Sequence, residues 1–223
     1  MKPLLNTTLL FLLLVIGFSG VVSGQDEADF YETKRLAERG LAFAQVNLGL
    51  MYDLGVGVPE NKAEAARWYR LAAEQGYASG QYNLGLMYDL GEGVPGNNAE
   101  AVRWYGLAAE QGNALAQTNL GLMYRNGEGV LRNDAEAARL YRLAAEQGNA
   151  LAQTNLGLMY ANGEGIPQNN ARAYMWWSVA AEQGNESARG NRDIVADRLV
   201  PDQLARGQDM ATRCSESDYQ DCE

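Results

Sequence analysis

Carboxylate side chains are the potentially reactive groups that recur with a fixed spacing in this sequence. One glutamate returns every 36 residues, at Glu74, Glu110, Glu146 and Glu182. Carboxylates serve as general acids and bases and as metal ligands, but a charge that returns at one outer helix position is typical of a solvated face. A second set lies in Gly-Glu-Gly turns, where one carboxylate per turn is too few for a calcium loop: Glu92, Glu128 and Glu164.

Histidine is absent from the sequence. Its absence removes the usual general base, the Ser-His-Asp and Cys-His arrangements, and the commonest metal ligand. The chain also contains no Gly-x-Ser-x-Gly, Ser-x-x-Lys or phosphate-loop motif. We therefore expect a protein that is not an enzyme, with no catalytic residue, no cofactor and no metal site.

The only cysteines, Cys214 and Cys222, lie within the last ten residues. In an oxidising compartment we expect them to form a disulfide, which closes a short loop and contributes about 2.5 kcal/mol in the chain-entropy model. This bond is expected to order the tail and to leave the rest of the chain untouched. The alternative is a pair of free thiols on a frayed end.

The N-terminal residues have the order of a secretory signal peptide. Lys2 precedes an apolar run from Leu9 to Phe18, and small or polar residues follow as far as Gly24. The apolar run is half as long as the roughly 20 residues of a membrane-spanning helix, so cleavage after Gly24 is favoured over a retained anchor. Residues 1–24 are predicted to direct export to the periplasm or the medium, with no membrane insertion after cleavage.

The chain is acidic, and its charge limits the class of partner. The formal net charge is −10, and loss of Lys2 with the signal peptide makes it −10 − 1 = −11. Because an anionic protein repels phosphate backbones, we expect no binding to nucleic acid.

The elements that carry these residues are organised by an internal repeat. Asn-Leu-Gly-Leu-Met-Tyr begins at Asn47 and returns unchanged at Asn83, Asn119 and Asn155, each time after 36 residues. A second motif, Ala-Glu-Gln-Gly, keeps the same spacing. Such a period indicates a stack of structural repeats in place of one or two globular domains. The four units are residues 41–76, 77–112, 113–148 and 149–184.

Each unit is predicted to be a pair of helices. In the third unit the apolar residues from Ala116 to Tyr124 have the spacing of one helix face, which predicts a first helix over about 114–124. Asn133 is placed to cap a second helix, and Glu136 to close a capping box with it. The second helix carries a stripe typical of a core, seen best in the first unit: Ala65, Trp68, Tyr69, Ala72 and Ala73.

Glycine occupies two informative positions in the unit. One follows the second helix, where a left-handed residue commonly ends a helix: Gly76, Gly112, Gly148 and Gly184. The other lies inside the first helix, where glycine costs about 1 kcal/mol relative to alanine: Gly49, Gly85, Gly121 and Gly157. Because the cost recurs at one position, we predict a close approach between helices that a side chain would block.

The unit resembles the Sel1-like repeat, a relative of the tetratricopeptide repeat. The matching residues in the third unit are Ala114, Ala116, Gln117, Leu120, Gly121 and Tyr124, then Gly127-x-Gly129-Val130, then Ala138, Tyr141 and Ala144 to Gly148. The resemblance covers Leu41 to Gly184 and implies an all-α fold, a right-handed α-solenoid of four 36-residue helix-turn-helix repeats. Some cysteine-rich relatives bind or hydrolyse β-lactams, but the paired cysteines of their repeats are missing here.

Segments outside the repeats are predicted to cap the open ends of the array. Residues 25–40 form an N-terminal capping helix, with Phe30, Tyr31 and Leu36 placed to cover the first unit. Residues 185–213 form C-terminal capping helices, and residues 214–223 a polar tail with the disulfide. In the last helix, which Pro201 begins, the packing side is predicted to carry Leu204, Gln208 and Ala211.

One face of the first helices is predicted to bind a partner. On a helical wheel with Leu48 in the core, the opposite side is apolar where solvent would favour polar residues. In tetratricopeptide-like solenoids this side lines the concave groove, so the resemblance implies a binding face made of Phe43, Val46, Leu50, Leu54, Tyr82, Leu86, Leu90, Leu115, Leu122, Arg125, Leu151 and Leu158. Thr118 is the equivalent of Val46 in the third unit. The alternative is that some of these leucines pack between neighbouring repeats.

These observations favour a non-enzymatic scaffold, adaptor or regulator in a bacterial cell envelope. We expect it to hold an extended or helical segment of another protein in the groove. An envelope protein that binds peptidoglycan or another carbohydrate is the first alternative, although only Phe43 and Tyr82 supply aromatic rings on that face. A β-lactam-binding or hydrolysing enzyme is the least favoured.

Overall fold

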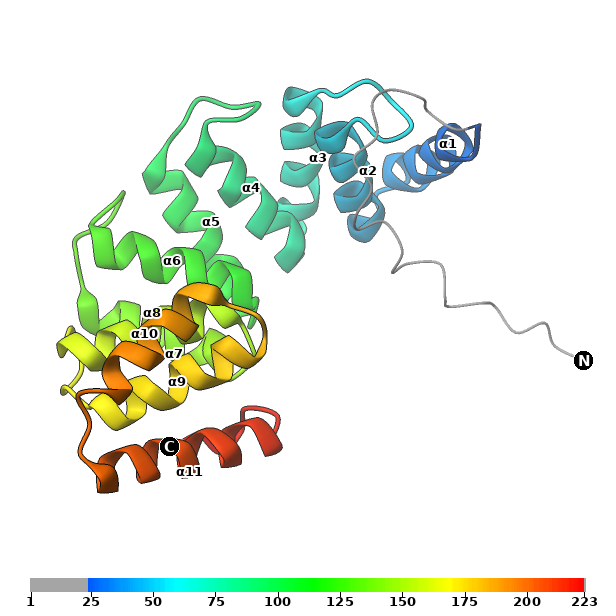
Figure 1. Cartoon of the computed structure of the whole chain (residues 1–223). Helices are drawn as coiled ribbons and strands as arrows, with labels where there is room; N and C mark the ends of the chain where they lie inside the picture. The colour runs from blue at the N-terminus through cyan, green and yellow to red at the C-terminus, as the bar shows by residue number, and fades with distance from the viewer. Residues whose placement is uncertain (1–23, 223) are drawn as a thin grey trace, which may run out of the picture.

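The computed structural model describes residues 24–222, which form a curved array of α-helices (Figure 1). No β-strand occurs in that range, in agreement with an all-α fold. The described helices are α1 (Gly24–Glu38), α2 (Ala42–Leu54), α3 (Lys62–Glu74), α4 (Ala78–Leu90), α5 (Asn98–Glu110), α6 (Ala114–Asn126), α7 (Asp134–Ala145), α8 (Ala150–Asn162), α9 (Asn170–Glu182), α10 (Glu186–Ala196) and α11 (Pro201–Glu216). Apart from Gly24, the predicted signal peptide lies outside the described residues and stays a prediction.

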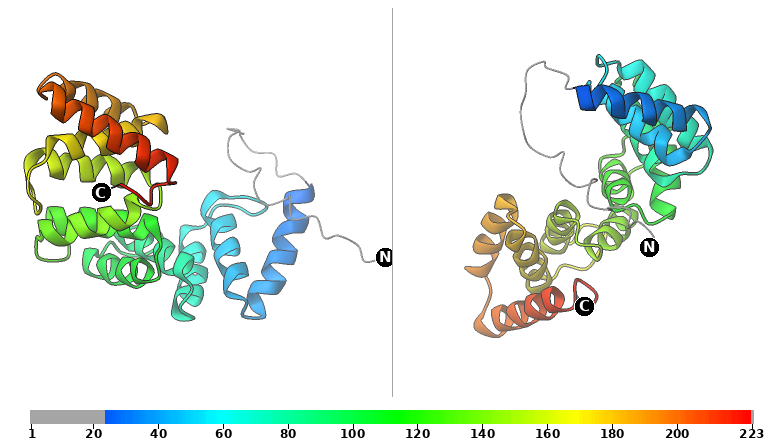
Figure 2. Two further views of the ribbon diagram at one scale, coloured as in Figure 1. Left: turned by 90° about the horizontal axis from the view of Figure 1, so that it is seen from below. Right: turned by 90° about the vertical axis from the view of Figure 1, so that its right-hand side faces the viewer.

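The four repeats are helical hairpins, as predicted. Their first helices, here called the A-helices, are α2, α4, α6 and α8, and their second helices, the B-helices, are α3, α5, α7 and α9. Each A-helix packs against the B-helix of its own unit and against the helix that precedes it in the chain. Figure 2 shows the hairpins following one another along a curved path, so each unit packs on its neighbours in sequence.

Asparagine N-caps begin the B-helices. The Asn133 side chain accepts the backbone N–H of Glu136 at 3.1 Å, and the same cap recurs in the other units. The predicted capping box is not formed, because the Glu136 carboxylate accepts two bonds from Arg139, at 2.6 and 2.9 Å. The N–H of Asn133 instead donates to the carbonyl of Tyr124 at 2.9 Å. That bond satisfies the donor left by the missing box and ties the B-helix to the A-helix of its unit.

Two glycines shape the turn between the A- and B-helices. α6 continues to Asn126, two residues beyond the predicted end, and Gly127 stops it with a φ of 76°. Gly129 has a φ of 68°, and a Cβ at this position would collide with the backbone carbonyl of Asn98 at the start of α5. The turn therefore lies directly against the preceding B-helix, an approach that only glycine permits. The glycines after the B-helices have φ values from 81° to 88°, the left-handed conformation that was predicted.

The glycine inside each A-helix faces an aromatic ring of the B-helix in the same unit. A Cβ on Gly121 would lie 2.9 Å from Cε1 of Tyr141, and one on Gly49 would lie 2.6 Å from Cε1 of Tyr69. In the fourth unit Trp177 takes the place of the tyrosine. The predicted close approach is thus confirmed, and each unit packs one large buried ring directly onto the A-helix backbone.

A buried glutamine on each A-helix links three segments of the array. The Gln117 side chain donates to the carbonyl of Ala109 on α5 at 3.1 Å and accepts a bond from Gln147 at 2.8 Å. The same two bonds are made in the other units by Gln45, Gln81 and Gln153. Each glutamine therefore satisfies a carbonyl at the end of the preceding helix and sets how successive units meet.

α1 covers the N-terminal end of the array. Phe30 and Ala37 are buried in the core of the first unit, and Leu36 packs beside them. Tyr31 was predicted to share this contact, but it is 61% exposed. Because successive residues point about 100° apart around a helix, burial of Phe30 turns its neighbour toward solvent.

The two C-terminal helices do not form a further repeat, and one residue of the predicted packing side is exposed. α10 packs on α9 as the A-helix of a fifth unit would, but α11 also packs mainly on α9. Arg192 occupies the position of the core leucine on α10, so α10 lacks the apolar stripe that a hairpin partner needs. Gln208, predicted on the packing side of α11, is exposed. The buried residues of α11 are Gly207, Met210, Ala211 and Cys214.

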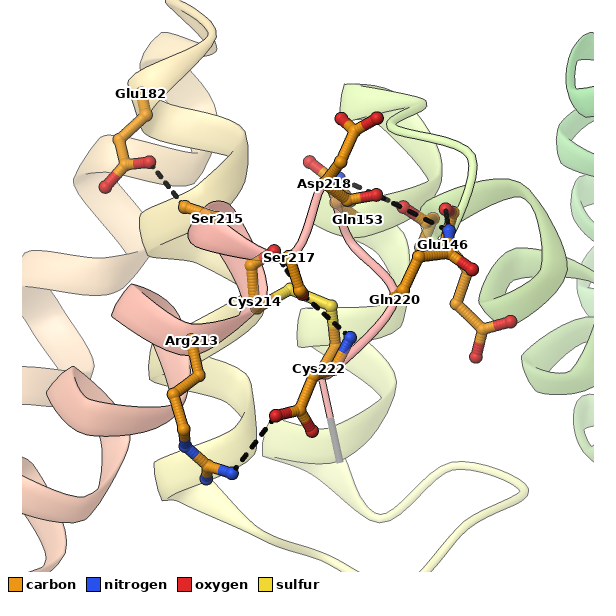
Figure 3. The surroundings of a disulfide bond; sticks show 12 residues. Glu146, Gln153, Glu182, Arg213, Cys214, Ser215, Ser217, Asp218, Gln220 and Cys222 are labelled. Atoms are coloured by element: carbon orange, nitrogen blue, oxygen red, sulfur yellow. Dashed lines mark hydrogen bonds and ion pairs between the residues drawn. A yellow bond between two sulfur atoms is a disulfide. The ribbon is translucent and has the colours of Figure 1, made fainter.

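The tail after α11 lies against the third unit. α11 ends at Glu216, and Cys214 and Cys222 form a disulfide in which both cysteines are buried (Figure 3). Gln220 donates to the backbone carbonyl of Glu146 at 3.2 Å. The expectation that the disulfide leaves the repeats untouched is therefore wrong, because the loop that it closes reaches the end of α7.

Candidate interaction surface

The residues predicted to bind a partner lie on the A-helices, and side-chain exposure divides them into two groups. Seven apolar side chains are exposed, and we call them the A-helix face: Phe43, Leu50, Leu54, Leu90, Leu115, Leu122 and Leu151. Five side chains are half-buried: Val46, Tyr82, Leu86, Arg125 and Leu158. The face is thus smaller than the sequence suggested.

Packing between units accounts for four of the half-buried residues. Val46 packs against the core shared by the first two units, and Leu158 against the C-terminal core. Tyr82 and Leu86 pack against the core of the second and third units. Thr118, the equivalent of Val46, is buried, and its hydroxyl donates to the backbone of its own helix at 2.7 Å. The alternative interpretation, packing between neighbouring repeats, applies to these positions.

One position of the A-helix carries a charge in three units, as Asp53, Asp89 and Arg125. In the second unit the hydroxyl of the buried Tyr105 donates to Asp89 at 3.2 Å and accepts a bond from Asn119 at 3.1 Å. Burial raises the pKa of Tyr105, the Asn119 bond opposes this rise and the negative charge of Asp89 adds to it. The phenol therefore stays protonated and serves as a structural donor.

The third unit lacks this tyrosine–aspartate hydrogen bond and has an ion pair to the next unit instead. Arg125 replaces the aspartate, and within the described residues the buried hydroxyl of Tyr141 has no hydrogen-bond partner. Burial raises the pKa of Tyr141 to about 12. Arg125 instead pairs with Glu164, in the turn of the fourth unit, at 3.0 Å.

Lys62 makes a comparable link between the first and second units. Its Nζ lies 2.8 Å from Asp53 and 3.4 Å from Glu92 in the next turn. The hydrogen bond to Asp53 is the main reason that the pKa of Lys62 is raised. Because these groups are partly exposed, such a pair contributes only about 0.2–1 kcal/mol, so its main effect is to orient adjacent units.

Asparagine, the first residue of the repeated motif, was not among the predicted binding residues. Asn47 is exposed and lies between the face residues Phe43 and Leu50 in the sequence. Its equivalents are half-buried, and the amide of Asn119 donates to the Tyr105 hydroxyl at 3.1 Å. A side-chain amide offers both a donor and an acceptor. The available signal was that asparagine is kept in all four units at a position that neither begins nor ends a helix.

The described residues offer little for other chemistry. Within residues 24–222, no group of three or more histidine, cysteine or acidic side chains is arranged to hold a metal ion. Over the same residues, no helix combines the length and the apolar character needed to cross a bilayer.

A family model and several solved structures match this chain. The model described as Sel1 repeat matches residues 42–77, 78–113, 114–149 and 150–185. These segments begin one residue later than the units defined above, because a repeat has no unique first residue. A search of the curated proteins finds no match.

Two of these structures share both sequence and fold with the chain. A protective antigen of uropathogenic Escherichia coli strains, which displays an SLR fold, is 39% identical with a TM-score of 0.75, over 87% of this chain and 43% of that one. A Sel1 repeat protein from Oxalobacter formigenes is 39% identical with a TM-score of 0.68, over 74% of this chain and 48% of that one. The chain thus spans less than half the length of either structure. Since the four matched repeats make up most of its length, the chain belongs to the Sel1 repeat family.

Proposed function

We propose that this protein is an exported, non-enzymatic scaffold that binds another protein through the A-helix face. Sel1 repeat proteins commonly act as protein-interaction scaffolds. The observation that carries the proposal is the row of seven exposed apolar side chains on four successive A-helices. Apolar side chains gathered on one surface commonly mark a site of protein interaction.

The spacing of the helices suggests the size of the ligand. Packed helices lie about 10 Å apart, so four A-helices span roughly 30 Å. At about 3.3 Å per residue, an extended chain of roughly nine residues covers that distance. The leucines supply apolar contacts, and the exposed Asn47 supplies an amide group that can pair with a peptide backbone. An extended or helical segment of a partner protein therefore fits this face better than a small metabolite does.

A carbohydrate ligand is disfavoured by the aromatic content of the face. Phe43 is exposed, but Tyr82 is half-buried, with its ring centroid 5.9 Å from that of Tyr105. A sugar ring would therefore meet a single free aromatic surface. The absence of histidine likewise disfavours an enzyme.

Export and a place in the bacterial envelope are part of the same proposal. They are supported by the signal-like residues 1–24 and by the Cys214–Cys222 disulfide, since disulfides persist in oxidising compartments. The similarity to a protective antigen agrees with a protein that leaves the cytoplasm.

In-cell photocrosslinking tests the binding face directly. A photoreactive amino acid replaces Leu50 or Leu122, and Leu131 serves as the matched control because it is 89% exposed in a turn and does not belong to the A-helix face. We expect both face positions to capture the same partner and Leu131 to capture none. Leu122→Asp should then abolish binding of the purified partner while the melting temperature stays nearly unchanged, since an exposed substitution usually alters stability by about 0.5 kcal/mol or less.

Other outcomes would reject the proposal. Equal capture from Leu131, or undiminished partner binding by Leu122→Asp, would contradict the assigned face. Turnover of a chromogenic β-lactam by the purified protein would contradict a non-enzymatic role. Specific sedimentation with peptidoglycan, without any protein partner, would favour the carbohydrate alternative.

A further inference from the structure

The outer face of the last B-helix, α9, is occupied by another helix of the same chain. α11 lies along this face, and a Cβ on its Gly207 would be 2.9 Å from Cδ1 of Tyr174 and 3.1 Å from the carbonyl of Ala171. Near the end of α11, Ser215 donates a hydrogen bond to the Glu182 carboxylate at 2.7 Å (Figure 3). The chain itself thus shows how a helix docks on the outside of a B-helix.

The repeat places equivalent residues on α3 and α5, and cavities lie beside them. Tyr174, Ser178 and Glu182 of α9 correspond, two units earlier, to Val102, Gly106 and Glu110 of α5. These three residues line a cavity of about 430 Å³ between α5 and α7. One unit further back, their equivalents on α3 line a smaller cavity of about 240 Å³. Residues equivalent to the α11-facing residues of α9 therefore line a cavity in each of the first two units.

The cavity between α5 and α7 presents apolar side chains, while the corresponding residues of the fourth unit are covered. Leu143 of α7 lines the cavity and is 37% exposed, whereas its equivalent Val179 is 1% exposed. Val179 belongs to a cluster with Met210 and Cys214 of α11. A helix seated between α5 and α7 would cover Leu143. The other apolar side chains around the cavity are Val102, Ala109, Leu120, Tyr124 and Leu140.

Gly106 adds an independent observation. Glycine disfavours a helix interior, and the glycines inside the A-helices are explained by the rings that lie against them. No neighbouring group requires glycine at position 106, because a Cβ on Gly106 would meet no atom within 4 Å. At the α9–α11 contact, Gly207 lets two helices approach closely. Gly106 lies on α5, the helix against which another helix would dock. Close approach of a docked helix would account for a glycine that the packing of this chain does not require.

The carboxylate of Glu110 indicates which side chain a docked helix would carry. Glu110 is exposed, and within residues 24–222 its carboxylate has no ion pair or hydrogen bond. Its equivalent Glu182 accepts a bond from α11. A donor on the docked helix, and a lysine or arginine above all, complements the free carboxylate.

We propose that the groove between α5 and α7 is a second docking surface, separate from the A-helix face, that takes an amphipathic helix of a partner protein. The docked helix carries a stripe of small and apolar residues like that of α11. It also places a cationic or hydroxyl side chain against Glu110. The partner's segment is helical because α11, the helix seated on the equivalent face, is helical over its whole contact.

A peptide probe tests the groove in the full-length protein. The probe is a fluorescent, lactam-bridged helix of residues 201–216 that carries Cys214→Ala and, to meet Glu110, Ser215→Lys. We expect saturable binding that Gly106→Leu weakens at least about tenfold, because the added side chain fills the groove. Glu110→Gln should weaken binding by about threefold and reduce its salt dependence. Leu131→Asp, in an exposed turn and not among the residues that line the cavity, is the matched control and should bind as the wild type does.

The test also separates a blocked groove from a damaged fold. Since nothing lies near the Cβ position of Gly106 and leucine favours a helix, Gly106→Leu should melt at or above the wild-type temperature. Failure of the probe to bind, or undiminished binding by folded Gly106→Leu, would overturn the proposal. So would probe binding that is lost in Leu122→Asp but kept in Gly106→Leu. Self-association of the full chain that Gly106→Leu abolishes would identify the occupant as a second copy and overturn the assignment to a partner.

Discussion

Two glycines at the centres of adjacent helices should respond in opposite ways to the same substitution. Gly121 lies on α6, where a Cβ would be 2.9 Å from Cε1 of the fully buried Tyr141. Gly106 lies on α5, where a Cβ would meet nothing within 4 Å. Replacing either residue with leucine gains about 1 kcal/mol of helix propensity. At Gly121 the ring is held on all sides, so the collision should exceed this gain.

The magnitude follows from the packing around Tyr141. Forcing a side chain into a filled core costs about 1–3 kcal/mol, and more when the neighbour cannot move. With leucine, which adds three carbons beyond Cβ, we expect Gly121→Leu to lose about 2 kcal/mol net. For a chain of this size about 2–4 °C corresponds to 1 kcal/mol, so Gly121→Leu should melt about 4–8 °C lower. Gly106→Leu should melt about 2–4 °C higher.

Thermal melts followed by circular dichroism decide between these outcomes, and the wild type and both variants should be measured at one protein concentration. In an array stabilised by neighbouring units, a loss in the third unit should also weaken its contacts with the second and fourth. The Gly121→Leu transition should therefore become broader as well as lower. A shift of the two variants in the same direction would refute the explanation of the glycine inside the A-helix.

Other predictions concern buried hydroxyls, the disulfide and the N-terminus. Tyr141→Phe should leave the free energy of unfolding in urea unchanged or slightly higher, because its hydroxyl is buried without a partner, whereas Tyr105→Phe should lose about 1 kcal/mol with its bonds to neighbouring side chains. Burial raises the pKa of Tyr141 to about 12, above the pKa of about 10 for tyrosine in the unfolded chain. The contribution of this pKa difference to stability is therefore fully present below about pH 10. This contribution is lost as the pH rises through the folded-state pKa. Tyr141→Phe has no phenol to ionise and should therefore unfold less readily than the wild type in alkali. Equal alkaline unfolding of the two proteins would contradict this. Replacing both Cys214 and Cys222 with serine should lower stability by about 2.5 kcal/mol, and hydrogen exchange should increase at the end of α7, where the tail lies. Intact-mass measurement of exported protein should show a chain that begins near Gln25 with its two cysteines joined, and retention of residues 1–24 would contradict export by a cleaved signal.

Much of the repeat follows from local sequence. The spacing of apolar residues predicts the helix pairs, and asparagine caps such as Asn133 begin the B-helices as expected. Glycine at Gly127 ends α6 because it alone adopts the left-handed conformation without strain. Gly121 even predicts a tertiary contact, since the same otherwise unfavourable residue recurs in every unit. These features can be predicted from the sequence because each depends on a few consecutive residues, and because four copies show which positions the unit requires.

Tertiary structure decides which surfaces stay open. Leu86 and Leu122 are identical residues at the same position of neighbouring units, yet the first is half-buried and the second is exposed. Exposure therefore depends on what the adjacent unit places beside each leucine, which the periodicity of a single helix does not encode. The same limit explains the capping box: Glu136 has the expected spacing, but its carboxylate is taken by Arg139, while the carbonyl of Tyr124 satisfies the Asn133 donor.

The C-terminal end shows this limit most clearly. The helical pattern from Pro201 is visible in the sequence, but it does not reveal that α11 packs on α9, with Gly207 in place of Gln208 at the contact. A helix finds its partner among all the apolar surfaces that the folded chain leaves uncovered, and those surfaces exist only once the units have stacked. Local sequence thus specifies the repeating unit, whose bonds join nearby residues, while the stacking of the units sets where the ends pack and which faces remain free to bind.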